Sequence, residues 1–319
     1  MTVKALDPYR PKVPGLLSHT GVHIPFSSSD FTRLIAASAC WGLGTVLSKA
    51  ALAHFEPYEL LIIQLGASVL AMGPVLVLRR VPFPKSREAV GLAGLGILNP
   101  GLAYLLGLAG LSLTSASLAS LIWALEPALI IFAARLLLGE RFTTRVAIGA
   151  GVGAAGVALV AAGPVSGSLI GFLLILAGVL CCAVYAAVTR LIAASGSVLV
   201  VVFCQHATAL GFAAIFALTA GNRPIEAWAL APPTARALAA LSGVIYYGVA
   251  FFLFVGALRR VPASEAGVFI NLVPVFGLIA AYLLLNERLG ATQWLGAGVV
   301  VVAMTLMVTG TRRPALPFL

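Results

Sequence analysis

The chain has 319 residues, of which 61% are hydrophobic and 9% charged, and its mean hydropathy is +1.07. Soluble domains carry roughly 25% charged residues, so this composition excludes an ordinary soluble protein and predicts an integral membrane protein. A net charge of +10 would suggest nucleic acid as the partner of a soluble protein, but in a membrane protein Lys and Arg mark cytoplasmic loops, and no nucleic-acid partner is expected.

Ten apolar stretches are long enough to cross a bilayer as helices, because about 20 apolar residues span the hydrocarbon. They are predicted at residues 33–54, 57–78, 88–109, 114–138, 144–163, 168–190, 198–220, 235–258, 264–285 and 292–310. The predicted fold class is therefore an all-α integral membrane protein with ten transmembrane helices. Residues 1–32 contain no run long enough for a signal peptide and are predicted to form a flexible tail, with residues 311–319 as a second tail.

The positive charges orient these spans. Loops on the same side as the termini carry 16 Lys and Arg residues, the opposite loops carry 3, and Lys49 lies inside a span. Because the side richer in Lys and Arg is cytoplasmic, both termini are predicted to lie in the cytoplasm. Lys49, near the outer end of the first span, is expected to extend its amine outward.

An internal repeat runs through the chain. Shifting the sequence by 147 residues aligns Leu111–Arg141 with Leu258–Arg288 without a gap, giving 13 identities in 31 positions. The matched pairs are Ser117/Ser264, Pro127/Pro274, Glu140/Glu287, Arg141/Arg288 and Gly96/Gly243 at this offset, and Lys49/Arg190 and Gln64/Gln205 at an offset of 141. Two halves of five helices are predicted, residues 33–163 and 168–310, inserted in opposite orientations because five is an odd number. Such inverted repeats build many secondary transporters, whose substrates bind near the midplane.

Three motifs accompany the repeat. Two proline-interrupted spans end in LLLGER at 136–141 and LLLNER at 283–288, and the first span contains CWGLGTVLSKAAL at 40–52. Together with the five-plus-five repeat, they resemble the EamA family of the drug/metabolite transporter superfamily over roughly residues 33–311. The resemblance implies a basket of ten helices whose helices 1, 3, 4, 6, 8 and 9 line a central cavity. It also implies export of amino acids and other small metabolites across a bacterial inner membrane, without a cofactor.

Glu126 lies near the middle of the fourth span, where an acid costs about 2.5–3.5 kcal/mol on insertion scales. One interpretation is a functional acid that faces a wet cavity. The other is a protonated carboxyl bonded to a hydroxyl or to a carbonyl freed by Pro127. The repeat pairs Glu126 with Val273, so the scaffold alone does not require the acid. Pro127 and Pro274 are predicted to be hinges that kink both helices and widen the cavity.

Polar and aromatic side chains deep inside the spans are the candidates for substrate binding, since membrane aromatics usually sit at the interface instead. The predicted substrate-binding residues are Trp41, Thr45, Asn99, Tyr104, Trp123, Glu126, Tyr185, Tyr246 and Asn271. Core packing or interhelical hydrogen bonding is the competing interpretation for each of them. Gln64 and Gln205 are predicted to be structural. The Glu–Arg pairs at 140–141 and 287–288 are predicted to cap the next helix or to form local ion pairs.

The glycines of the fifth and tenth spans, such as Gly149, Gly153 and Gly296, predict close helix packing, with a homodimer seam as a further interpretation. The four cysteines lie in apolar spans and the four histidines lack metal-ligand spacing, so no metal site is expected.

One mid-depth acid without a matching base favours a small neutral or zwitterionic substrate, such as an amino acid with an apolar or aromatic side chain, moved by alternating access. The alternatives are export of a different metabolite or drug class, and a membrane enzyme acting on a lipid-linked substrate. The enzyme would require clustered acids, Arg and His at one membrane face, and no catalytic residues of this kind stand out.

Overall fold

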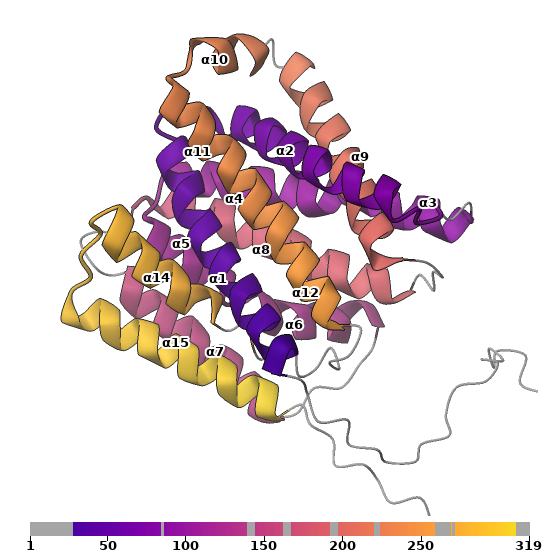
Figure 1. The fold of residues 1–319 in the computed structure, drawn as a ribbon. Helices are drawn as coiled ribbons and strands as arrows, with labels where there is room; N and C mark the ends of the chain where they lie inside the picture. The colour runs from indigo at the N-terminus through magenta and orange to yellow at the C-terminus, as the bar shows by residue number, and fades with distance from the viewer. Residues whose placement is uncertain are drawn as a thin grey trace, which may run out of the picture.

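The computed structural model describes residues 28–83, 86–138, 144–161, 167–191, 197–219, 224–258, 269 and 272–310, and these residues are predominantly helical (Figure 1). The first half of the chain contains α1 (Ser28–Ala51), α2 (Pro57–Leu78), α3 (Arg87–Gly94), η1 (Leu95–Ile97), η2 (Leu98–Leu102), α4 (Ala103–Ser112), α5 (Ala116–Trp123), α6 (Glu126–Leu138) and α7 (Thr144–Ala161). The second half contains α8 (Leu169–Leu191), α9 (Val198–Thr219), α10 (Pro224–Leu230), α11 (Pro233–Gly243), η3 (Val244–Val249), α12 (Ala250–Leu258), α14 (Val273–Leu284) and α15 (Ala291–Gly310).

Seven helical stretches among the described residues are long and apolar enough to cross a membrane. They are Ser28–Ala51, Pro57–Leu78, Arg87–Ser112, Ala116–Leu137, Leu169–Thr189, Leu199–Thr219 and Pro233–Phe254. They coincide with the first four and the sixth to eighth predicted spans, while α7, α14 and α15 stand where the other three were expected. The protein is an all-helical, multi-pass membrane protein, and the count of ten crossings stays a prediction.

The first helix begins earlier than the sequence suggested. α1 starts at Ser28, so residues 28–32 belong to a helix and not to the predicted N-terminal tail. Asp30 lies in the first turn, where its negative charge is favourable beside the free backbone N–H groups. The Thr32 hydroxyl donates a hydrogen bond of 2.9 Å to the carbonyl of Ser28 and stabilises the same turn. Residues 1–27 and 311–319 lie outside the described part of the chain.

The third and fourth predicted spans are broken helices. In the third, Asn99 has non-helical backbone angles (φ −143°, ψ 117°), and a π-helical turn, η2, leads from this point into α4. In the fourth, α5 ends at Trp123, Ala124 and Leu125 form a turn, and α6 begins at Glu126. Breaks of this kind expose backbone groups at membrane depth, and they are tolerated where the chain lines a cavity.

The eighth and ninth predicted spans are also irregular. The eighth contains the π-helical segment η3 between α11 and α12. In the ninth, α14 begins only at Val273 and carries Pro274 in its first turn. Pro127 likewise occupies the second position of α6. Both prolines therefore stand in the first turn of a helix, where a proline lacks only an N–H that has no partner within the helix. Their role as hinges stays a prediction.

The glycines of α7 serve packing within the chain. α7 lies beside α15 along one edge of the molecule (Figure 1). A methyl group at Gly156 would stand 2.8 Å from the carbonyl oxygen of Gly296, so the two backbones approach too closely for any other residue. Nothing lies within 4 Å of a methyl group at Gly151 or Gly298. The face that could have formed a dimer seam through Gly156 is covered by the chain's own α15.

Two glutamines tie the halves of the chain together in matching ways. The amide nitrogen of Gln64 donates hydrogen bonds of 2.8 Å to Ser48 of α1 and 2.8 Å to Ser242 of α11. The amide of Gln205 accepts a hydrogen bond of 2.9 Å from the hydroxyl of Tyr185 and donates one of 3.0 Å to the carbonyl of Leu92. The repeat partners Gly243 and Gly96 admit these glutamine backbones, because a methyl group at either glycine would overlap them. These contacts agree with a structural role for both glutamines.

Two charged side chains, Lys49 and Glu287, bind the junction between α4 and α5. We call these two residues, together with the junction, the Lys49–Glu287 corner. The amine of Lys49 donates hydrogen bonds to the terminal carbonyls of α4, at 2.8 Å to Leu111 and 3.3 Å to Ser112. Glu287 accepts hydrogen bonds from the Ala116 N–H (2.8 Å), the Ser117 N–H (3.0 Å) and the Ser117 hydroxyl (2.6 Å) at the start of α5. The positive amine of Lys49 thus lies at the C-terminal end of α4, which carries a partial negative charge. The negative carboxylate of Glu287 lies at the N-terminal end of α5, which carries a partial positive charge.

This corner corrects one prediction. The amine of Lys49 binds the carbonyls that end α4, and its extension toward the outer face stays a prediction. Glu287 caps a helix, as expected, but that helix is α5, whose first residues are 171 positions away, and not α15, which follows it. Arg288 lies over the ring of Tyr282, with 3.9 Å between its guanidinium carbon and the ring centroid. The predicted Glu140–Arg141 pair lies outside the described residues.

A candidate substrate cavity between the broken helices

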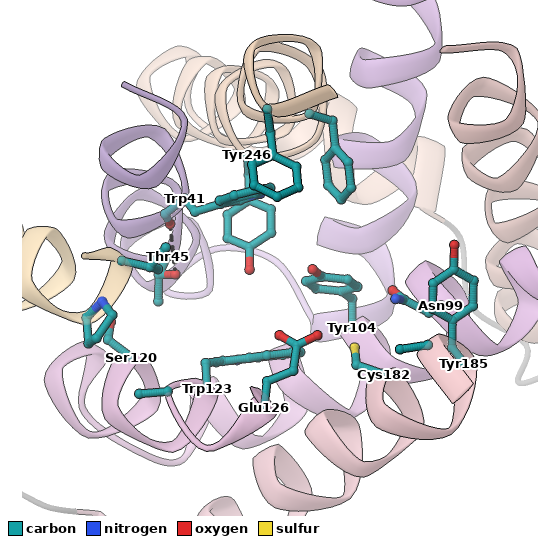
Figure 2. A pocket seen from close by; sticks show the side chains of 16 residues that line it. Trp41, Thr45, Asn99, Tyr104, Ser120, Trp123, Glu126, Cys182, Tyr185 and Tyr246 are labelled. Carbon is teal, nitrogen blue, oxygen red and sulfur yellow. Dashed lines mark hydrogen bonds between the residues drawn. The ribbon is translucent and has the colours of Figure 1, made fainter. Parts of the chain in front are cut away.

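A cavity of about 240 Å³ lies at the level of the helix breaks (Figure 2). It is lined by Trp41, Thr45, Asn99, Tyr104, Ser120, Trp123, Ala124, Glu126, Cys182, Tyr185, Ala186, Tyr246, Phe251, Phe254, Val273 and Pro274. These residues come from α1, η2, α4, α5, α6, α8, η3, α12 and α14, so both halves of the chain contribute walls. The cavity is larger than the roughly 150 Å³ engineered site that holds benzene in another protein.

Eight of the nine predicted substrate-binding residues line this cavity, namely Trp41, Thr45, Asn99, Tyr104, Trp123, Glu126, Tyr185 and Tyr246. The ninth, Asn271, lies outside the described residues. Pro274, one of the predicted hinges, is also part of the wall. The backbone of Pro127 is described, but its side chain is not. The structure brings the candidates together, and their role in binding stays a prediction.

Aromatic rings form most of the wall. Tyr104 stacks on Trp123 with 5.2 Å between ring centroids and 18° between ring planes. Tyr246 meets Tyr104 edge to face at 5.5 Å. Across the cavity, Trp41 meets Phe251 at 5.5 Å and Phe254 at 5.3 Å, both edge to face. Such arrangements fix large rings in place and present flat apolar surfaces that suit an apolar or aromatic group.

Glu126 is the acidic residue of the described lining. It is the first residue of α6, it is partly buried, and its carboxylate points into the centre of the cavity (Figure 2). Among the described residues, no hydrogen-bond donor or cation pairs with this carboxylate. No Lys, Arg or His lines the described wall. A cationic group of a ligand would complete its interactions.

Ser120 offers a second polar group without a protein partner. Its side chain is 1% exposed, and its hydroxyl oxygen has no hydrogen-bond partner among the described residues. It lines the cavity from α5 and lies against Gly277 of α14, where a methyl group would collide with the hydroxyl. A buried hydroxyl without a partner costs free energy. Ser120 and Glu126 therefore both have unused capacity for a hydrogen bond.

Other polar candidates have their donors occupied. The hydroxyl of Thr45 donates a hydrogen bond of 3.1 Å to the carbonyl of Trp41 in the same helix. The hydroxyl of Tyr185 donates to Gln205 at 2.9 Å. Both oxygens can still accept a hydrogen bond from a ligand, but neither hydroxyl is free to donate one. Asn99 projects its amide from the irregular turn of η2, beside Tyr185 (Figure 2).

The lining residues that the sequence did not single out include Ser120, Phe251 and Phe254. Ser120 was passed over because Ser112, Ser115 and Ser117 precede it and nothing local distinguishes it. Phe251 and Phe254 were read as ordinary apolar residues of a span. Their signal was the helical spacing of three residues, which places both rings on the face of α12 that meets Trp41.

A much smaller cavity of about 20 Å³ lies next to the first. The two cavities share Thr45, Tyr104, Trp123 and Tyr246 in their walls. The small cavity reaches Leu111, whose carbonyl binds Lys49, and Gln64, whose buried amide oxygen has no partner in the described part of the chain. Its volume suits a single water molecule. Three aromatic rings thus separate the larger cavity from the Lys49–Glu287 corner.

Broken helices around a ligand-sized cavity are typical of membrane transporters of small molecules. The EamA-like transporter family matches residues 32–162 and again residues 169–309. The chain therefore belongs to the EamA-like transporter family and is a membrane transporter of small molecules, as the sequence resemblance indicated. Members of this family are transporters, which agrees with the prediction that the protein is not an enzyme.

Individual proteins are also similar to this chain. The "Putative permease-like protein YdzE" of Bacillus subtilis (strain 168) is 29% identical over 66 residues, which cover 21% of this chain and 85% of that protein. A crystal structure of another protein superposes with a TM-score of 0.60 at 18% identity and covers 88% of this chain and 96% of that one. The second likeness concerns the fold alone.

Proposed function

We propose that this protein exports small neutral or zwitterionic metabolites, and that amino acids with apolar or aromatic side chains are its substrates. The observation that carries the proposal is the composition of the cavity, in which aromatic rings surround a carboxylate and the described lining contains no Lys or Arg. A phosphorylated or strongly anionic substrate would require cationic side chains to bind it. An amino acid instead offers an ammonium group for Glu126 and a hydrophobic side chain for the rings.

The substrate carboxylate would face the polar groups that remain. Ser120 and Asn99 both line the cavity, and the Ser120 hydroxyl has no partner among the described residues. α14 begins at Val273, which also lines the cavity, so backbone N–H groups and the positive end of that helix lie nearby. This distribution separates a binding region for an ammonium from one for a carboxylate, as a zwitterion requires.

Transport would proceed by alternating access between two inverted halves, residues 33–163 and 168–310. The family matches the chain twice, over nearly the same ranges, which supports this division. In the present conformation, Tyr104, Trp123 and Tyr246 stand between the cavity and the Lys49–Glu287 corner. Opening that side would require these rings to separate and the bonds between Glu287 and α5 to break.

The test of substrate class is uptake into proteoliposomes that contain the purified protein. Leucine and phenylalanine should be transported, and each should compete with the other. A sugar phosphate should be neither transported nor inhibitory. Transport of the sugar phosphate without transport of any amino acid would contradict the proposal.

The orientation has its own test. The excess of Lys and Arg on one side supports an orientation in a bacterial inner membrane with both termini in the cytoplasm. A reporter that is active only in the cytoplasm, fused to the C-terminus, should therefore be active. A signal from the periplasmic side would contradict the cytoplasmic position of the C-terminus.

A further inference from the structure

A cavity of about 180 Å³ lies between α2, α9 and η3, and its walls include none of the residues that line the substrate cavity. Every residue that lines it is apolar, with Met72 and Val75 from α2, Leu199 from α9, Gly248 from η3 and Phe252 from α12. We call it the α2–α9 crevice. Its volume exceeds the roughly 150 Å³ that accommodates benzene, so a hydrocarbon chain several carbons long fits inside.

The crevice opens on the surface that faces the bilayer. Phe252 is 42% exposed and Val249 is 38% exposed, while Met72, at the base of the crevice, is buried. An apolar cavity that stays empty loses the dispersion contacts of the atoms around it. Water gains nothing there, because the crevice offers no polar partner. The hydrocarbon of the bilayer is the material that can fill it.

One end of the crevice has a positive charge. Arg79 is the C-terminal capping residue of α2, one helical turn beyond Val75, and its guanidinium carbon lies 5.8 Å from the centroid of the Phe252 ring. Arg80 follows it, and both residues are exposed. Among the described residues, no carboxylate forms an ion pair with Arg79. Arginine at the end of a membrane helix attracts anionic headgroups and can hold a phosphate with two hydrogen bonds.

We propose that the α2–α9 crevice binds one anionic glycerophospholipid. Its acyl chain lies between Met72, Leu199 and Gly248, and its phosphate binds Arg79. The charge at one end of the crevice selects the headgroup, while the apolar walls accept the chain of any lipid. Both features are needed, because surface charge alone gives no fixed site, and an apolar crevice alone does not distinguish one headgroup from another.

The site shares a structural element with the substrate cavity. Val244 and Gly248 of η3 line the crevice, whereas Tyr246 of the same π-helical segment lines the substrate cavity. A bound acyl chain would therefore pack against the segment that positions Tyr246.

The test measures which lipids stay on the purified full-length protein. The protein is equilibrated with equal amounts of phosphatidylglycerol and phosphatidylcholine of matched acyl chains, and the retained lipid is identified by native mass spectrometry. Wild-type protein should retain one phosphatidylglycerol in preference to phosphatidylcholine by about five-fold, the effect of one Arg near an anionic headgroup. Arg79→Gln should abolish the preference and leave binding of either lipid in place.

Gly248→Leu tests the apolar part of the site. A Cβ at this position would meet only the Cβ of Ala71, at 3.9 Å, so a larger side chain can enter the crevice without a clash at its first atom. Both lipids should then be lost, while the unfolding temperature in detergent stays at the wild-type value. Gly211→Leu is the matched control, because Gly211 lies in α9 with no atom within 4 Å of a Cβ, and retention should be unchanged. Equal retention of both lipids by the wild type, or full retention by Gly248→Leu, would overturn the proposal.

Discussion

Two glutamates in this membrane protein differ in how completely the chain satisfies them. Glu287 accepts three hydrogen bonds from Ala116 and Ser117, at 2.6 to 3.0 Å. Glu126 points into the aromatic cavity, where the described chain gives it no donor and no cation. A satisfied acid stabilises a structure, whereas an unsatisfied one at membrane depth is retained at a cost in free energy. The difference fits a scaffold role for Glu287, while ligand binding by Glu126 stays a prediction.

The largest effect is expected from Glu126→Gln. The amide keeps the shape and hydrogen-bonding capacity of the side chain but cannot pair with an ammonium group. A hydrogen bond to a charged group contributes about 1.5–3 kcal/mol, so amino-acid transport should fall roughly ten- to hundred-fold. The measurement is flux into proteoliposomes with and without a pH gradient, together with the unfolding temperature, which should not fall.

This substitution also separates two interpretations of Glu126. If the carboxyl only donates a hydrogen bond within the chain, the amide should replace it almost fully. Wild-type flux in both conditions would then place Glu126 in the scaffold. The variant could instead lose only the transport of substrate against its concentration gradient that a pH gradient drives, and still exchange substrate. That result would identify the acid as the site of proton coupling.

Glu287→Gln should produce the opposite pattern. The neutral amide loses the charge-assisted hydrogen bonds at the start of α5, and the free energy of unfolding should fall by about 1.5–3 kcal/mol. Substrate affinity should change by less than about two-fold, a difference of under 0.5 kcal/mol in binding free energy. The two readouts are thermal unfolding in detergent and equilibrium binding of an amino acid. A large loss of affinity with unchanged stability would reverse the roles of the two glutamates.

Trp123→Leu tests whether the aromatic wall acts on the substrate or only on packing. Trp123 stacks on Tyr104 within the cavity wall. An aromatic pair contributes about 0.5–1.5 kcal/mol beyond its buried area, so affinity for phenylalanine should fall about two- to ten-fold. Trp228→Leu is the matched control. Trp228 stacks on Phe55 with 6.5 Å between ring centroids, and it lines neither the substrate cavity nor the smaller cavity next to it. Equal losses from both substitutions would favour packing alone.

Much of the architecture was predictable because the signals are local. Apolar runs of about 20 residues located the helices, and the prolines at 127 and 274 indicated where two of them are interrupted. Polar and aromatic residues deep within apolar spans pointed to the cavity wall, since nothing in lipid favours them there. Trp41 and Tyr104, from spans far apart in sequence, were both found in this way.

The remaining features depend on contacts between distant residues. Glu287 binds α5 across 171 positions, and the sequence near Glu287 shows only the helix that follows it. Lys49 resembles any lysine near the end of a span, and only the fold brings the carbonyls of Leu111 and Ser112 to its amine. Ser120 differs from its neighbouring serines because its hydroxyl finds no hydrogen-bond partner among the described residues. Local patterns do not encode such relations.

The smallest expected effect comes from Ser120→Ala, compared with Ser242→Ala. Both serines are almost fully buried, at 1% and 0% exposure. Ser242 accepts a hydrogen bond of 2.8 Å from Gln64, whereas the Ser120 hydroxyl has no partner among the described residues. Removing the Ser242 hydroxyl should lower the free energy of unfolding by about 1 kcal/mol and leave binding unchanged. Removing the Ser120 hydroxyl should leave stability unchanged or slightly raised, because an unpaired buried group disappears.

If the Ser120 hydroxyl binds the substrate carboxylate, Ser120→Ala should weaken amino-acid binding by about five-fold, the equivalent of one hydrogen bond of about 1 kcal/mol. The corresponding amine, which lacks the carboxylate, should bind the variant and the wild type equally well. Isothermal titration with phenylalanine and phenethylamine distinguishes these cases. An equal loss for both ligands would mean that Ser120 shapes the cavity without contacting the carboxylate. No loss for either would mean that Ser120 does not contact the substrate, and the carboxylate would then be left to Asn99 and the start of α14.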